Sequence, residues 1–196
     1  MTTRKTIFYV KSNGPVPLCP FCHADLSYRD SRRRVSKLEG GAKRWLIIRR
    51  FRCGSCKALH TELPDCLAPY KHYQTEIISG VIDGVITQDD LESEDYPCLD
   101  TMRLWLAWFT QNLERMEGLL HKALYEISGN IQELQHPSGS LLEKLRRTTL
   151  NWLEQALRTI YNSGGFLDLC QYFGHKKLKV YADFSNSSSS FCCGVI

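Results

Sequence analysis

With 196 residues, the chain has room for one ordinary domain or for two small modules that share a core. A hydrophobic fraction of 43% and four Trp exclude a disordered chain, and a net charge of +4 does not by itself identify a partner. Residues 1–17 lack the apolar core of a signal peptide, and no later run approaches a membrane span. We therefore expect a cytoplasmic protein, in which paired Cys more often bind metal than form disulfides.

The predicted strands come first along the chain. Residues 7–10 are a short run of β-branched and aromatic side chains. Residues 34–38 and 43–51 are extended segments joined by a Gly-bearing turn at 39–42, which predicts a hairpin. The pattern indicates β structure over residues 5–66.

The predicted helices follow. A helical period begins at Tyr70 and ends near Val81, and Asp100 is a candidate N-cap for a strong helix that runs to about residue 124. The stretch between them, residues 87–97, is acidic and broken. Two further segments have helical patterns: residues 141–161, and a short helix at 166–172. The Ser-rich run near 185–190 has no such pattern and predicts a flexible end.

Basic residues are concentrated in the predicted hairpin. Between Arg29 and Arg52 lie ten Lys or Arg against two acids. A local excess of this size is typical of a surface that binds a polyanion. A merely solvated hairpin face would have the same composition, so the charge pattern alone leaves both interpretations open.

Four cysteines form the most specific pattern in the sequence. Cys19 and Cys22 make one CxxC pair, and Cys53 and Cys56 make a second after thirty intervening residues. Two residues between thiolates let both sulfurs of a tight turn point at one ion, and two such turns complete a closed tetrahedral site. The spacing therefore predicts a zinc ribbon with one structural Zn²⁺, whose ends are brought together by the hairpin.

Other interpretations of single cysteine motifs explain less. Residues 19–23 also match the CxxCH string of haem attachment, and Cys-Pro-Phe-Cys is a glutaredoxin-like dithiol sequence. Neither accounts for the second CxxC pair. With four cysteines available, His60 is expected to be a strand or surface residue and not a ligand. Cys66, Cys98 and Cys170 are expected to be small buried hydrophobes.

A resemblance to known proteins begins at the second cysteine pair. The run from Arg49 to Cys56, followed by the string 60–64 (His-Thr-Glu-Leu-Pro), resembles the N-terminal zinc ribbon of bacterial insertion-sequence transposases. The longer string 60–73 is similar to an uncharacterised bacterial family that pairs this ribbon with a helix-turn-helix and often lies beside transposase genes. Residues 97–105 are similar to that family's Pro-Ser-x-x-Thr-Ile-x-x-Trp pattern. The resemblance covers roughly residues 5–110.

The resemblance implies a DNA-binding protein of a mobile element. Its helix-turn-helix would consist of residues 70–81 and a recognition helix at 100–109, which offers Arg103 as its main cation. The acidic run from Asp89 to Asp95 would repel phosphate. Residues beyond 109 predict helices without the strand-borne carboxylates of a transposase catalytic domain, so we expect no enzymatic activity.

Together these patterns predict an α+β protein with an N-terminal antiparallel zinc ribbon and a helical remainder. The predicted units are the ribbon (1–68), a helix-turn-helix-like region (69–128), a C-terminal helical region (129–184) and a tail (185–196). The expected partner is double-stranded DNA, with a transposase or its ATPase and a homodimer as further candidates. A protein-interaction adaptor and an RNA-binding protein remain alternatives. The predicted nucleic-acid contacts are Arg32, Arg33, Arg34, Lys43, Arg44, Arg49, Arg50, Arg52 and Arg103.

Overall fold

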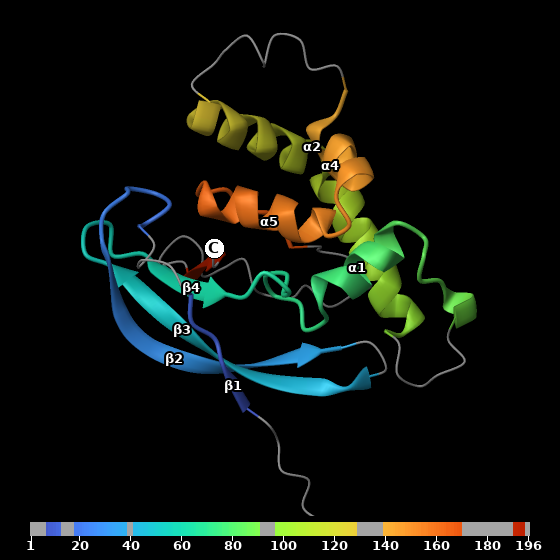
Figure 1. Cartoon of the computed structure of the whole chain (residues 1–196), viewed down its shortest axis with the longest axis horizontal. Helices are drawn as coiled ribbons and strands as arrows, with labels where there is room; N and C mark the ends of the chain where they lie inside the picture. The colour runs from blue at the N-terminus through green and yellow to red at the C-terminus, as the bar shows by residue number, and fades with distance from the viewer. Residues whose placement is uncertain are drawn as a thin grey trace, which may run out of the picture.

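The computed structural model describes residues 7–12, 18–38, 41–90, 97–128, 139–169 and 190–194. Its elements, in chain order, are β1 (Ile7–Tyr9), β2 (Leu26–Lys37), β3 (Lys43–Cys53), β4 (Leu59–Leu63), α1 (Thr75–Ile82), the 3₁₀ turn η2 (Gln88–Asp90), α2 (Leu99–Ser128), α4 (Leu141–Thr148), α5 (Trp152–Asn162) and β5 (Ser190–Gly194). The predicted α+β class is confirmed (Figure 1).

Strand β3 is the centre of the sheet. One of its edges pairs with β2 in an antiparallel ladder that runs from Leu26 opposite Cys53 to Lys37 opposite Lys43. Its other edge is shared: β1 pairs in parallel with residues 45–47, and β4 pairs antiparallel with residues 50–52. Strand β5 continues the sheet in parallel beyond β4. The sheet is therefore mixed, where the sequence predicted a purely antiparallel ribbon.

The hairpin is longer than its apolar content suggested. Both strands extend to the cysteine pairs, and a register shift between Tyr28 and Asp30 marks a bulge in β2. Residues 27–34 lack an apolar helical period and are strand throughout. Because a bulge increases the local twist of a strand, β2 is expected to twist most near its cysteine end, where the bulge lies.

The helices pack into a core of their own. Met102, Trp105 and Phe109 of α2 are buried with Ile78 of α1 and Trp152 of α5, as the helical periods predicted. Figure 1 shows α2, α4 and α5 stacked on one side of the sheet. On that side Leu46 and Ile48 of β3 lie in a second apolar cluster with Leu63 and Leu67.

Three helical predictions differ from the structure. The predicted helix 141–161 is divided, since α4 ends at the extended residue Thr149 and α5 begins at Trp152. The described part of the predicted helix 166–172, residues 166–169, is not helical. Residues 83–98 separate α1 from α2, which is far longer than the three- or four-residue turn of a helix-turn-helix. In this respect the structure differs from the motif that the resemblance implied.

Two findings concern the predicted tail and a membrane. Ser190–Gly194 forms strand β5, whereas the sequence predicted a flexible end there; the rest of the Ser-rich run lies outside the described residues. None of the helices that the structure describes is long and apolar enough to cross a bilayer.

Candidate functional site

The structure brings the four predicted cysteine ligands together. Cys19 and Cys22 lie in the turn before β2, while Cys53 ends β3 and Cys56 lies in the turn to β4. Their sulfur atoms all lie within 4.8 Å of one another. The Sγ–Sγ distances are 3.6 Å for Cys19–Cys56 and 3.4 Å for Cys22–Cys53. Tetrahedral ligands with Zn–S bonds of about 2.3 Å are separated by about 3.8 Å, so the quartet could hold one metal ion.

The two cysteine turns have the same backbone conformation. Cys19 N–H donates to the Ala24 carbonyl and Cys53 N–H to the Ala58 carbonyl, each at 2.9 Å, so both bonds span five residues. The residue after the second cysteine of each pair has a positive φ, 55° at His23 and 64° at Lys57. Positive φ is costly for a non-Gly residue and marks a conformation that the surroundings impose. Two matched turns aimed at one point are what a four-sulfur site requires.

Backbone donors favour negative charge on the sulfurs. Burial acts to raise the pKa of Cys53, but hydrogen bonds from the N–H groups of Cys56 and Ser55 act against it, and the pKa is lowered to about 6. At Cys56, a bond from the Ala58 N–H acts to lower the pKa, whereas burial and the Cys53 sulfur raise it to about 12. Four thiolates at these distances repel one another, so the quartet can be fully deprotonated only with a cation among the sulfurs.

His60 belongs to this site, although the sequence placed it on an ordinary strand position. It lies in β4 and is fully buried, with its Nε2 atom 3.4 Å from Cys19 Sγ and its ring beside Phe21. Burial lowers the pKa of His60, so the ring is neutral and can donate one N–H, to sulfur. Its Nδ1 atom is buried and has no hydrogen-bond partner among the described residues. In the sequence, the sign that His60 belongs to this site was its position four residues after Cys56.

Several predicted DNA contacts are engaged within the protein. Arg49 forms a two-bond ion pair with Glu62, which is 1% exposed, and Arg50 forms one with Asp30. Arg34 donates to two backbone carbonyls in the segment before α1. Removing one partner of a buried pair leaves the other charge uncompensated. Arg49 and Glu62 are therefore part of the structure that holds β3 to β4.

The remaining predicted contacts of the hairpin are exposed. These are Arg32, Arg33, Lys43, Arg44 and Arg52. Register places Arg32, Arg44 and Arg52 on the face of Leu46 and Ile48, and Arg33 and Lys43 on the opposite face. Arg103, at the start of α2, is exposed and lies 3.7 Å from Asp100. The eight hairpin cations thus do not form one continuous contact surface.

The other described cysteines differ from one another. Cys66 is half-buried against the cluster of Leu46 and Leu63, and burial raises the pKa of its thiol. Cys98 was predicted to be buried, but it is exposed at the start of α2. The hydroxyl and N–H of Thr101 hold the pKa of Cys98 below its ordinary value. The buried face of α2 begins at Met102, and Cys98 lies outside that face.

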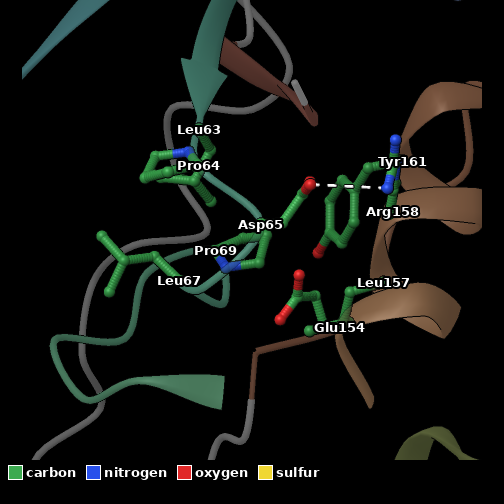
Figure 2. Close-up of a pocket in the computed structure, with 9 residues that line it drawn as sticks. All are labelled: Leu63, Pro64, Asp65, Leu67, Pro69, Glu154, Leu157, Arg158 and Tyr161. Carbon is green, nitrogen blue, oxygen red and sulfur yellow. Dashed lines mark ion pairs between the residues drawn. The ribbon is translucent and has the colours of Figure 1, made fainter. Parts of the chain in front are cut away.

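A small pocket separates the segment after β4 from α5 (Figure 2). Asp65 crosses it to Arg158, with 3.4 Å between their charged atoms, and Glu154 and Tyr161 of α5 complete the wall. Burial raises the pKa of Asp65 and of Glu154. A volume of about 20 Å³ admits roughly one water molecule, so this pocket is not a ligand site.

Fold and site together define an α+β protein with a four-cysteine centre that could hold a metal ion. Residues 19–105 match the model of a family described as a domain of unknown function (DUF6431). The matched region begins at the first cysteine of the quartet and ends within α2. No curated protein and no solved structure matches the chain.

Proposed function

We propose that the chain is a DNA-binding protein whose hairpin is held in shape by a structural zinc ion. The observation that carries the proposal is the charge of the hairpin. Strands β2 and β3 contain ten cations and one acid, Asp30, which is itself paired with Arg50. Ion pairs inside the protein hold some of these cations, but six are exposed, Arg29 among them. Exposed Arg and Lys at this density contact phosphates and supply affinity that depends on salt.

Zinc is the metal that best suits the quartet. Four sulfur ligands in two turns favour a closed tetrahedral Zn²⁺ site with no open position for catalysis. Bound there, zinc would supply folding energy, about 10–16 kcal/mol in zinc-finger peptides. We expect one zinc per chain by metal analysis. Cys53→Ser should lose the metal and unfold the region 18–66, whereas Cys66→Ser should retain both. Absence of zinc, or an intact ribbon in Cys53→Ser, would contradict this assignment.

DNA binding is tested by its salt dependence. For duplex DNA, each phosphate contact contributes about 0.9 to the slope of log affinity against log salt. Changing Arg32, Arg44 and Arg52 to Ala should flatten that slope by up to about 2.7 units. The matched control changes three exposed cations of the helical region, Lys122, Lys144 and Arg147, and should leave the slope unaltered. Equal loss in both variants would mean that net charge, and not the hairpin, governs binding.

The helical contact predicted from the resemblance is tested separately. Arg103→Ala should weaken binding less than the hairpin variant does, because α2 buries Met102 and Trp105 in the core and its first turn already pairs Arg103 with Asp100. A larger loss from Arg103→Ala would make α2 the main contact. RNA and an acidic protein are the competing partners. Comparing the affinities for a DNA duplex and an RNA duplex of the same length tests whether RNA is the partner.

The resemblance supports a role in a bacterial mobile element, either accessory to transposition or regulatory. The helical region would then dock a transposase or its ATPase, or a second copy of the chain. We further propose that the protein does not cut DNA itself. In the described residues the cysteine quartet is the sole cluster of metal-ligand side chains, and the acids at 91–96 lie outside them. Metal-dependent nicking of supercoiled plasmid, abolished by one carboxylate change, would refute this.

A further inference from the structure

The sheet has a second face, opposite the cluster of Leu46 and Ile48, that is both aromatic and basic. Partners in neighbouring strands share a face, so the register gives two rows across β1, β3 and β2. One row is Ile7, Trp45 and Val35; the next is Tyr9, Ile47 and Arg33. Leu46 and Ile48, which alternate with these residues in β3, are 5% and 0% exposed on the other face. The two rows therefore lie on the face opposite the buried apolar cluster.

This face is accessible in the part of the chain that the structure describes. Tyr9 is 80% exposed and Ile7 is 39% exposed. Arg33 and Lys43 are exposed beside them, while Trp45 and Ile47 are half-buried. A contiguous exposed apolar patch with a polar rim is typical of an interaction site, and here Tyr9, Ile7 and their row adjoin two exposed cations.

The charge on this face selects a polyanion. Arg33 and Lys43 lie on it without an acid beside them in the described strands, because Asp30 is paired with Arg50 and Glu62 with Arg49. An acidic protein would satisfy the cations, but it would need a separate apolar side chain to cover the Tyr9 ring and its row. Nucleic acid supplies both, since each nucleotide brings a phosphate and a flat base.

The width of the face selects unpaired bases over a duplex. Strands β1, β3 and β2 are adjacent, so their outer backbones lie about 10 Å apart before side chains are counted. A major groove about 12 Å wide admits a helix or a two-stranded ribbon, but not three strands with their side chains. A single strand has no such limit, because its bases can be splayed over a sheet and stacked on aromatic rings.

We infer that the Tyr9 face binds an unpaired DNA strand, with one base stacked on Tyr9 and the adjoining phosphates held by Arg33 and Lys43. This inference rests on the proposed DNA-binding function and deepens it. The two faces of the hairpin would then have separate tasks. Arg32, Arg44 and Arg52 on the other face would contact duplex phosphates, so the protein would engage DNA where the duplex is opened.

The test compares single-stranded and duplex DNA of the same sequence by fluorescence anisotropy with the zinc-loaded full chain. Tyr9→Ser should weaken single-strand binding about 5- to 150-fold, the effect of one lost base–aromatic stack, and leave duplex binding unchanged. Tyr9→Phe should retain wild-type binding because stacking does not need the hydroxyl. Tyr125→Ser, a control on α2 where Tyr125 is 42% exposed, should have no effect. Zinc content and circular dichroism verify that each variant is folded.

Several outcomes would overturn the inference. Unchanged single-strand binding in Tyr9→Ser would do so, as would an equal loss on single strand and duplex, or a preference for RNA of the same length. A dimer in light scattering that Tyr9→Ser dissociates, with DNA affinity unaltered, would make this face a contact between two copies. If the wild type binds duplex but not single strands, the proposed function stands and this inference fails. If it binds neither, both fail.

Discussion

Removing the imidazole of His60 should weaken metal binding without unfolding the strand. The His60→Phe change keeps an aromatic ring beside Phe21 but deletes the Nε2 atom, which lies 3.4 Å from Cys19 Sγ. The change also removes the Nδ1 atom, which is buried and has no hydrogen-bond partner in the described part of the chain. The contact with the Cys19 sulfur is therefore the hydrogen bond of the His60 side chain that is lost. A hydrogen bond to a charged acceptor contributes about 1.5–3 kcal/mol, which corresponds to a loss of roughly 10- to 150-fold in affinity. Outer partners of metal ligands give similar losses, about 10- to 100-fold.

The assay is competition for Zn²⁺ against a chelator of known affinity, together with the thiolate-to-metal absorption of the Co²⁺ form. His60→Phe should weaken binding and shift the absorption, because one sulfur loses a donor. His60→Gln, which restores an N–H, should recover part of both. His72→Phe is the matched control, since His72 is exposed and distant from the sulfurs. Wild-type affinity and spectrum in His60→Phe would refute the reasoning, and a nitrogen ligand in X-ray absorption would make His60 a ligand itself.

Three further predictions concern contacts of Gly164, Glu117 and Cys98. Gly164→Ala places a Cβ 2.6 Å from the Pro20 carbonyl oxygen, so it should lower the free energy of urea unfolding by about 1–3 kcal/mol. Gly84 has nearly the same φ but no described atom within 4 Å of its would-be Cβ, so Gly84→Ala should lower that free energy less. Glu117 accepts bonds from the first N–H groups of α4, so Glu117→Ala should lower the unfolding free energy by about 1 kcal/mol, measured in the same way. Thr101 lowers the pKa of Cys98, so alkylation of Cys98 should reach half its maximal rate at a lower pH than that of an ordinary thiol. Thr101→Ala should move this midpoint to higher pH. An unchanged pH profile in Thr101→Ala would exclude the Thr101 hydrogen bond as the cause.

The cysteine quartet could be predicted from the sequence because its chemistry is local. A CxxC turn fixes where two sulfurs point, and a hairpin that joins two such turns in the right register brings the pairs together. The same reasoning found the strand at 7–10, the two strands of the hairpin and the long helix beginning near Asp100. Each of these predictions depends on a local pattern, or on two local patterns joined by one hairpin, which one sequence displays directly.

Long-range partners could not be predicted in this way. Arg49 and Arg50 look like their neighbours in sequence, yet Glu62 and Asp30 neutralise them, and nothing local distinguishes Arg49 from Arg52. Strand β1 pairs in parallel with β3, which no turn connects directly, so its pairing was not visible in the pattern. His60 was set aside because four cysteines complete a tetrahedral site. The site's outer partners follow from the register between β3 and β4, which places His60 opposite Phe51.

A metal at the quartet would account for the high charge of the hairpin. Ten cations on two paired strands repel one another, and the apolar cluster at the cysteine end is small: Cys19, Leu26, Phe51 and Cys53. Such a cluster cannot by itself offset that repulsion, and small scaffolds of this kind rely on a metal or on a larger body. This chain has the means for both, because a metal at the quartet would fix the base of β2 and β3, while the carbonyl of Pro20 lies against Gly164 at the end of α5. At the far end of the hairpin, Arg34 donates to the Lys71 carbonyl and Lys37 to the Tyr73 hydroxyl. The strands between can therefore be strongly cationic, since the hairpin is held at both ends.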